Sequence, residues 1–221
     1  LVNSILLSPL PGVREPQRLF GNSNDVVSYP TYLDFKEQIE GKAELAGFAS
    51  RSIAISSGGQ SVLGRGQLVS GSYFSAVGTG CASGRLLGPA DDQPGAPPAA
   101  VVSHAYWEEA LHADVGAVGS LLTVNGVAVE IVGVSAPGFR GTRVTDFPQV
   151  FMPIALWPRI APSSYQGFGL DRRSWGWVSF VGRMAPGVSL AQMEGALNHS
   201  LRRQHELYPD AIGPDDSIKL Q

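Results

Sequence analysis

Residues 121–134 read Leu-Leu-Thr-Val-Asn-Gly-Val-Ala-Val-Glu-Ile-Val-Gly-Val, and this stretch holds the clearest structural signal in the chain. Asn125-Gly126 separates two runs that are rich in β-branched residues. A two-residue type I′ turn needs a positive φ at both of its central positions, which asparagine and glycine adopt most readily. The stretch therefore predicts a tight β-hairpin, and Pro137-Gly138 marks its end.

Weaker signals on both sides of this hairpin predict a mixture of short strands and helices. Apolar runs indicate strands, and serine-capped amphipathic runs indicate helices. The expected strands begin at Leu19-Phe20 and otherwise cover residues 46–55, 61–69, 100–102, 150–153, 177–184 and 217–221. The expected helices follow Ser28, Ser70, Ser103 (to about Ala113) and Ser189, the last with the capping-box pattern Ser189-x-x-Gln192. Because strands and helices do not alternate regularly, the fold class predicted is α+β.

The segment 89–99, Pro-Ala-Asp-Asp-Gln-Pro-Gly-Ala-Pro-Pro-Ala, is the best candidate for a boundary between subdomains. Its density of proline and glycine is typical of a turn-rich connector. We expect residues 1–88 and 171–221 to form one discontinuous lobe with a split sheet. Residues 89–170 would then form an inserted, β-rich small lobe.

Composition excludes several classes of protein. Charged residues make up only 16% of the 221-residue chain, and the formal net charge is −3 without any run of like charges. A surface that follows nucleic-acid phosphates needs clustered lysine and arginine, so we expect no nucleic-acid partner. The chain holds no stretch of ~18 apolar residues, which a complete membrane span needs. The apolar run Leu1–Leu7 fits either the end of a helix or a first strand.

The sequence lacks the motifs of the common catalytic sites. Gly41-Lys42 is followed by alanine, so no phosphate-binding P-loop is present, and neither a dinucleotide-binding glycine pattern nor Gly-x-Ser-x-Gly occurs. Cys81, the only cysteine, has small neighbours that supply no base, so we expect a buried small side chain rather than a nucleophile. We therefore expect no enzyme activity and no cofactor.

Two groups of residues remain as candidate sites. His104, Glu108 and His112 are four residues apart, so a helix would place them on one face as three potential metal ligands. A solvated helix face is the favoured interpretation, and a metal-dependent enzyme is the alternative. Phe139 and Arg140 lie between Gly138 and Gly141 and are a candidate interaction loop. The alternative is that Arg140 packs over its own domain.

Nine short segments, taken in order, resemble a known family. They are Leu6–Pro11, Tyr29–Asp34, Val69–Phe74, Gly84–Leu87, Val101–Trp107, Asn125-Gly126, Val132–Val134, Pro137–Gly141 and Phe151–Pro153. Together they resemble the extracytoplasmic (periplasmic) core domain of MacB-like and FtsX-like ABC transporter permeases. The likeness is closest to the orphan permeases that are abundant in acidobacteria.

This resemblance implies a non-catalytic domain with two lobes, a discontinuous porter-like lobe and an inserted small β-rich lobe. It implies an integral membrane protein at the periplasmic face of the bacterial inner membrane, anchored through flanking helices that this chain lacks. The implied partners are an ABC ATPase, a second copy of the permease and a periplasmic adaptor protein. The implied role is to couple ATP-driven conformational change to transport or efflux across the envelope.

A stand-alone extracytoplasmic ligand-binding or sensory module is the alternative to a transport domain. The sequence that flanks this domain in the gene distinguishes the two, because a permease needs about 20 apolar residues on each side of the domain. Polar flanks would exclude the permease.

Overall fold

The computed structural model describes residues 12–22, 26–143, 146–165 and 169–221, and the run Leu1–Leu7 lies outside these ranges. The described chain is α+β, as predicted. Its strands are β1 (Leu19–Gly21), β2 (Ala43–Ser56), β3 (Val62–Val69), β4 (Cys81–Gly84), β5 (Ala99–Val102), β6 (Leu121–Val124), β7 (Val127–Ser135), β8 (Val150–Pro153) and β9 (Ser179–Met184). Its α-helices are α1 (Tyr29–Gln38), α2 (Tyr73–Val77), α3 (His104–Glu109), α4 (Trp157–Ile160) and α5 (Leu190–Leu207), and its 3₁₀ turns are η1 (Pro16–Arg18), η2 (Ile154–Leu156) and η3 (Ser163–Tyr165).

The predicted Asn-Gly hairpin is confirmed, and it joins β6 to β7. Asn125 has φ 48° and Gly126 has φ 85°, the two positive values that a type I′ turn needs. The turn also holds a third strand in place, because the backbone N–H of Asn125 donates to the Ala54 carbonyl at 2.9 Å, while its Oδ1 accepts from the Ala54 N–H at 2.8 Å. The hairpin is thereby joined to β2.

Six strands close into a small barrel. β2 pairs with β3, β3 with β8, β8 with β5, β5 with β7, β7 with β6, and β6 returns to β2. Two of these pairings, β3 with β8 and β5 with β7, are parallel, so the barrel is mixed. Apolar side chains that alternate along the strands fill its interior, as period-two geometry requires. β4 adds to the free part of the β7 edge.

β2 extends out of the barrel and forms a second layer with β9 and β1. Its first residues, from Ala43 to Phe48, pair with β9, and its later residues, from Phe48 to Ile55, pair with β3. β9 in turn pairs with β1. One 14-residue strand therefore belongs both to the barrel and to the three-stranded sheet.

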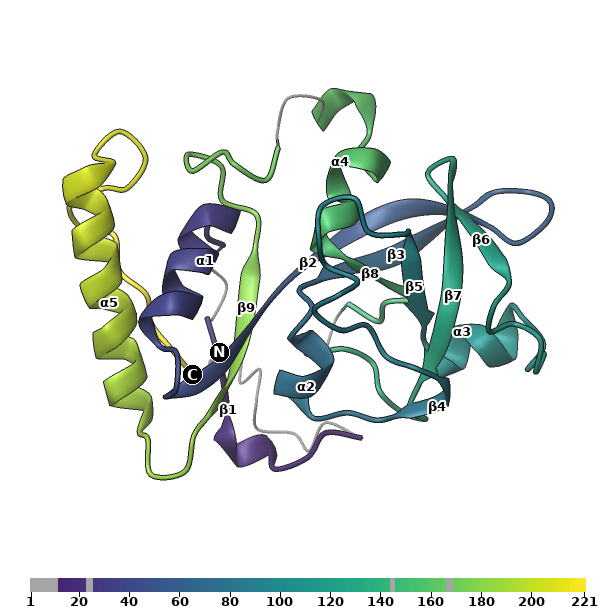
Figure 1. Ribbon diagram of the computed structural model, residues 1–221, viewed down its shortest axis with the longest axis horizontal. Coiled ribbons are helices and arrows are strands. Elements are labelled where there is room, and N and C mark those ends of the chain that lie inside the picture. Colours follow the sequence, from purple (N-terminus) through teal and green to yellow (C-terminus); the bar gives the residue numbers. More distant parts are fainter. Residues whose placement is uncertain (1–11, 23–25, 144–145, 166–168) are drawn as a thin grey trace.

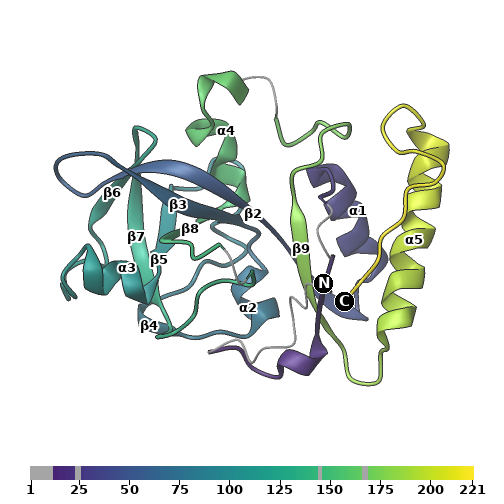
Figure 2. The ribbon, with the colours of Figure 1, turned by 180° about the vertical axis from the view of Figure 1, so that it is seen from behind.

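Helices cover both faces of the three-stranded sheet (Figures 1 and 2). Phe20, Leu45 and Phe180 pack in the core that includes α1 and α5, whereas their sequence neighbours pack in a second core around α2. This alternation follows from the opposite directions of successive side chains in a strand. In Figure 1 the helical layer of α1 and α5 lies at the left and the barrel lies at the right.

Three local expectations were wrong. Ser70 does not cap α2, because Ser72 occupies the N-cap position and the Ser70 hydroxyl accepts from the Gly47 N–H at 3.0 Å. The helix after Ser103 ends at Glu109, well before Ala113. Residues 217–221 form no strand of their own, and only Leu220 makes an isolated bridge, to Asn22. In each case tertiary contacts decided what the local pattern left open.

No helix in the described part of the chain is both long enough and apolar enough to cross a membrane.

Candidate functional site

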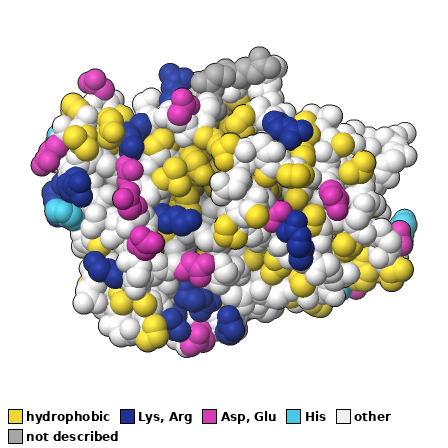
Figure 3. All heavy atoms as spheres, viewed as in Figure 1, with side chains coloured by type: hydrophobic (Ala, Val, Ile, Leu, Met, Phe, Trp, Pro, Cys, Tyr) yellow, Lys and Arg dark blue, Asp and Glu magenta, His cyan; other side chains and the backbone are white. Residues whose placement is uncertain are grey.

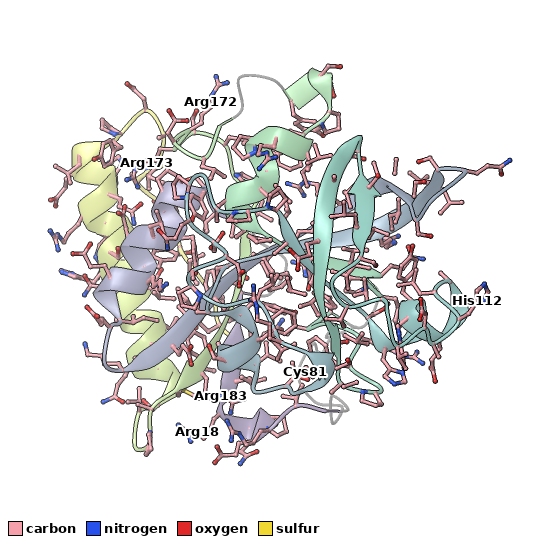
Figure 4. The ribbon with its side chains drawn as sticks, turned by 45° about the vertical axis from the view of Figure 1, so that its right-hand side comes forward. Arg18, Cys81, His112, Arg172, Arg173 and Arg183 are labelled. Carbon is pink, nitrogen blue, oxygen red and sulfur yellow. The ribbon has the colours of Figure 1, made fainter. Side chains whose placement is uncertain are left out.

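The three predicted metal ligands do not share one helix face. His104 Nδ1 lies 3.1 Å from Glu108 Oε2 across one turn of α3. His112 lies beyond the end of the helix with φ 54°, and Figure 4 shows it at the outer end of the barrel. Within the described ranges no group of three or more His, Cys, Asp or Glu side chains is arranged to hold a metal ion. The aligned face was a wrong expectation, because the helix is too short to reach the third residue.

Cys81 is exposed, which corrects the prediction of a buried side chain. It begins β4, whose four residues are all exposed on the outside of the barrel. Its small neighbours indicated a packed interior, but they instead form an edge strand that covers nothing.

The candidate interaction loop presents only one of its two predicted residues. Phe139 is buried, and its ring stacks on Phe151 at 5.7 Å between centroids. Arg140 is exposed, and its guanidinium lies 5.4 Å from the centre of the Phe147 ring. Phe147 itself is half exposed. The exposed pair is therefore Arg140 and Phe147.

A cluster of aromatic rings lies where the barrel meets the three-stranded sheet. The guanidinium of Arg51, in the middle of β2, lies 5.1 Å from the Trp157 ring centre and 5.1 Å from that of Trp177. Trp177 also stacks on Trp175 at 5.2 Å, and Tyr165 closes the cluster. Arg51 thus joins α4, which follows the barrel strand β8, to the segment that precedes β9.

Burial gives this junction its electrostatic character. Trp157 and Trp177 are almost completely buried, and desolvation lowers the pKa of the Arg51 guanidinium. A cation over two indole faces regains part of the lost hydration energy, by roughly 0.5–2 kcal/mol for each face. On the side shown in Figure 3, hydrophobic side chains gather near the middle of the molecule, between the helical layer and the barrel.

A partly buried carboxylate fixes the proline-rich connector to both parts of the fold. Asp92 Oδ2 accepts from the Gly71 N–H at 3.0 Å, and its Oδ1 accepts from the Ala155 N–H at 2.8 Å. Gly71 precedes α2, whereas Ala155 follows the barrel strand β8. Burial raises the pKa of Asp92, and the two backbone donors and Lys36 oppose this shift. The connector is therefore held rigidly at this point.

Replacing Asp92 with asparagine is expected to lower the free energy of unfolding by about 1–3 kcal/mol. The amide nitrogen of asparagine is a donor, so one of the two backbone N–H groups loses its acceptor. Because the folded state raises the Asp92 pKa, this carboxyl makes the domain less stable as pH rises from its ordinary pKa of ~3.9 towards the raised value. Chemical denaturation at several pH values measures both effects. The variant should lack this pH-dependent loss, and an unchanged profile would contradict the assignment.

The N-terminal segment is fastened by two arginines. Arg183 Nε donates to the Ala76 carbonyl at 2.7 Å, and its Nη2 donates to the carbonyls of Val77 at 2.7 Å and Arg14 at 2.6 Å. Arg18 donates to the Met184 carbonyl through Nε at 3.0 Å and Nη2 at 2.6 Å. Figure 4 shows Arg18 and Arg183 close together beside this segment. The segment is therefore bound to α2 and to the end of β9.

A third arginine lies between two adjoining cavities of about 410 and 320 Å³. Arg173 Nη1 donates to Asp34 Oδ2 at 2.6 Å and to Gln204 Oε1 at 2.9 Å, and its guanidinium lies 4.2 Å from the ring centre of Tyr208. These contacts join the segment before β9 to α1 and α5 (Figure 4).

Reasoning from the sequence missed Arg51, Asp92, Arg173 and Arg183. A pair of aspartates in a proline-rich connector and the pattern Trp175-x-Trp177 were the only signals available for two of these places. Neither pattern indicates which residues these side chains contact, because each contact joins residues that are far apart in the sequence.

Comparison with known proteins agrees with this architecture. Residues 4–200 match the sequence profile of the MacB-like periplasmic core domain family. No curated protein matches the chain significantly. The likeness to acidobacterial permeases stays a prediction.

Solved structures share the fold. The periplasmic region of MacB from Actinobacillus actinomycetemcomitans is similar with a TM-score of 0.69 and 14% identity over 98% of this chain and 92% of that one. The extracellular domain of the noncanonic ABC-type transporter YknZ from Gram-positive bacteria has a TM-score of 0.62 and 12% identity over 89% and 91% of the two chains. The profile match over most of its length shows that the chain belongs to the MacB-like periplasmic core domain family, so it is the periplasmic or extracellular domain of an ABC transporter permease.

Proposed function

We propose that this domain is non-catalytic and couples ATP-driven conformational change in its permease to transport or efflux across the envelope. A permease of the ABC class implies an ATPase partner, which would supply the motion. The observation that carries the proposal is the continuity of β2, which pairs with β9 at one end and with β3 and β6 at the other. Displacement of the sheet would therefore reach the barrel along a single strand.

The segments near both ends of the described chain support the same path. The N-terminal segment is bound to β9 through Arg18 and to α2 through Arg183. At the other end, Gly21 in β1 exchanges two backbone hydrogen bonds with Gln221, at 3.1 and 3.2 Å. Force applied to either segment would act on the β1–β9 pair, which adjoins β2.

We also propose a division into two lobes, with the border inside β2. The porter-like lobe would contain β1, β9, the start of β2 and the helices α1 and α5. The inserted lobe would contain the barrel. The pairing of β3 with β8 supports this border, because it places residues 62–69 beside the segment 89–170 that we expected to form the small lobe. The connector at 89–99 would then lie within the second lobe, fastened by Asp92.

The partners follow from this role. We propose that the permease acts with a second copy of itself and with a periplasmic adaptor protein, and that flanking helices anchor the domain in the membrane. A ligand-binding or sensory module is the second candidate, and the two cavities beside Arg173 favour it.

Spin-label distances in the full-length permease with its ATPase test the coupling. Leu121 and Leu207 are both 67% exposed and belong to β6 and α5, so each accepts a label with little disturbance. With Cys81→Ser as background, we expect the distance between Leu121→Cys labels of the two copies to change when ATP binds. The distance between Leu121→Cys and Leu207→Cys within one copy should stay nearly constant, because β2 connects both parts. Constant distances between the copies throughout ATP hydrolysis would refute the coupling.

A further inference from the structure

The most unusual exposed side chain is Phe147. Its backbone has φ 36°, a value that bulky residues rarely adopt, and 51% of its surface is exposed. A positive φ places the Cβ of a non-glycine residue too close to the following carbonyl oxygen. Such strain persists only where the surroundings impose it, and it concentrates at functional sites. An exposed aromatic ring gains little from burial, so folding alone does not account for it.

Both sequence neighbours of Phe147 are tied into the fold. The next residue, Pro148, is buried, and Asp146 on the other side accepts from the Ser50 hydroxyl at 2.5 Å. Earlier in the same loop, Arg143 donates to the Ser179 hydroxyl at 2.7 Å. Asp146, the neighbour of Phe147, is therefore tied to β2, and Arg143 is tied to the first residue of β9.

Arg140 supplies a cation beside this ring. Its guanidinium lies 5.4 Å from the ring centre of Phe147, and among the described residues it forms no ion pair with a carboxylate. Arginine and aromatic residues are the side chains that most often dominate the energy of protein interfaces. An exposed arginine on the face of an aromatic ring remains able to bind a carboxylate with the edge of its guanidinium group.

We propose that Arg140 and Phe147 form the docking site for a separate folded protein outside the membrane, which presents a carboxylate beside a shallow apolar pocket. The carboxylate would pair with Arg140, and the pocket would receive the Phe147 ring. A lipid surface also attracts an arginine and a phenylalanine, but it needs no fixed backbone conformation. The strained and fastened backbone favours a partner of defined shape. This inference rests on the proposed function in that it names the surface for an extracytoplasmic partner.

Thermal unfolding of the chain tests whether Phe147 is strained in its backbone or stabilises the fold through its ring. Glycine accepts a positive φ without penalty, whereas alanine does not. We expect the Phe147→Gly variant to unfold about 2–4 °C above Phe147→Ala, and no lower than the natural chain. A ring with a structural role would instead make both variants clearly less stable than the natural chain, and that result would overturn the proposal.

Photocrosslinking in the full-length permease, in its native membrane, tests the partner. With Phe147→benzoylphenylalanine we expect an adduct with a separate protein. The adduct should persist with Arg140→Lys, fall at least tenfold with Arg140→Glu, and keep its yield with the control Arg159→Glu, a charge reversal at an exposed residue of α4. The crosslinked peptide should contain Asp or Glu.

Every other result overturns the docking site as proposed. An adduct with lipid alone indicates a membrane contact, an adduct with a second permease indicates a contact between copies, and no adduct or no dependence on Arg140 excludes the carboxylate pairing. The experiment needs no ATP. If no adduct forms but the spin-label distances still respond to ATP, only this inference is rejected. If the adduct forms as expected but the distances between the copies stay constant, only the coupling is rejected.

Discussion

The Trp157→Ala substitution is expected to lower the free energy of unfolding by about 3–5 kcal/mol. Trp157 is 2% exposed, and its ring packs against Trp177 with 5.6 Å between the ring centroids. Its removal leaves a cavity at the junction of barrel and sheet, and it leaves the partly buried Arg51 guanidinium with one aromatic face instead of two. For a domain of this size each kcal/mol of lost stability lowers the midpoint of thermal unfolding by about 2–4 °C, so that midpoint should fall by roughly 10 °C.

Two control variants make this prediction specific. Trp157→Phe should cost less than about 1.5 kcal/mol, because it keeps an aromatic ring and removes an indole N–H that has no hydrogen-bond partner among the described residues. Trp175→Ala removes a partly exposed member of the same cluster and should cost less than Trp157→Ala. Urea denaturation measures all three. An equal cost for the two alanine variants would show that the cluster is not organised around Trp157.

A double-mutant cycle isolates the contribution of the cation. Arg51→Met keeps most of the apolar stem and removes the charge, so its combination with Trp157→Leu, which removes the aromatic face, measures the coupling of guanidinium and indole. We expect a coupling of about 0.5–2 kcal/mol. A coupling near zero would mean that Arg51 is held by packing alone.

Loss of Arg183 is expected to release the N-terminal segment. Its guanidinium donates to four backbone carbonyls, those of Ala76, Val77, Arg14 and Glu15. Arg183→Met should therefore lower the free energy of unfolding by about 2–4 kcal/mol, since each charged hydrogen bond contributes more than a neutral one but part of the group is open to water. Amide exchange should show the local effect, because the Arg14 N–H, which donates to the Gly78 carbonyl at 3.1 Å, should lose protection.

Lysine at the same position distinguishes charge from geometry. An ammonium group keeps the charge but cannot reach carbonyls of separate segments with a planar fork, so Arg183→Lys should recover less than half of the loss. In the full-length permease both variants should reduce transport at least tenfold while the ATPase continues to hydrolyse ATP. Normal transport with a released segment would contradict the proposed path of force.

Local elements were predictable because short-range physics determines them. Asn125-Gly126 specifies its turn through backbone sterics, and Ser189 with Gln192 forms the capping box that the sequence predicted. The helix cap at Ser28 and the strands around residues 46–55 and 150–153 follow from spacing and polarity in the same way. The resemblance to MacB-like domains was also confirmed, because residues 4–200 match that family.

The candidate site was far less predictable. Phe139 was singled out beside Arg140, but the ring at the surface is that of Phe147, because the loop bends and buries the first aromatic residue against Phe151. The helix after Ser103 stopped before His112, and the small residues around Cys81 formed an exposed edge. Each error concerned which side of the molecule a residue faces, and local spacing does not determine this when elements are short.

The sequence by itself determined the α+β class, the Asn-Gly hairpin, the helix caps at Ser28, Ser103 and Ser189, and the family, because backbone preferences act within a few residues. Only the tertiary structure decided that β6 returns to β2 and closes a barrel, and that β2 belongs to two layers at once. It also decided that Arg51 meets two tryptophans and that Asp92 and Arg183 bind the backbone of distant segments. Such contacts depend on desolvation and close packing between residues that are remote in the chain, and these forces have no signature in local sequence.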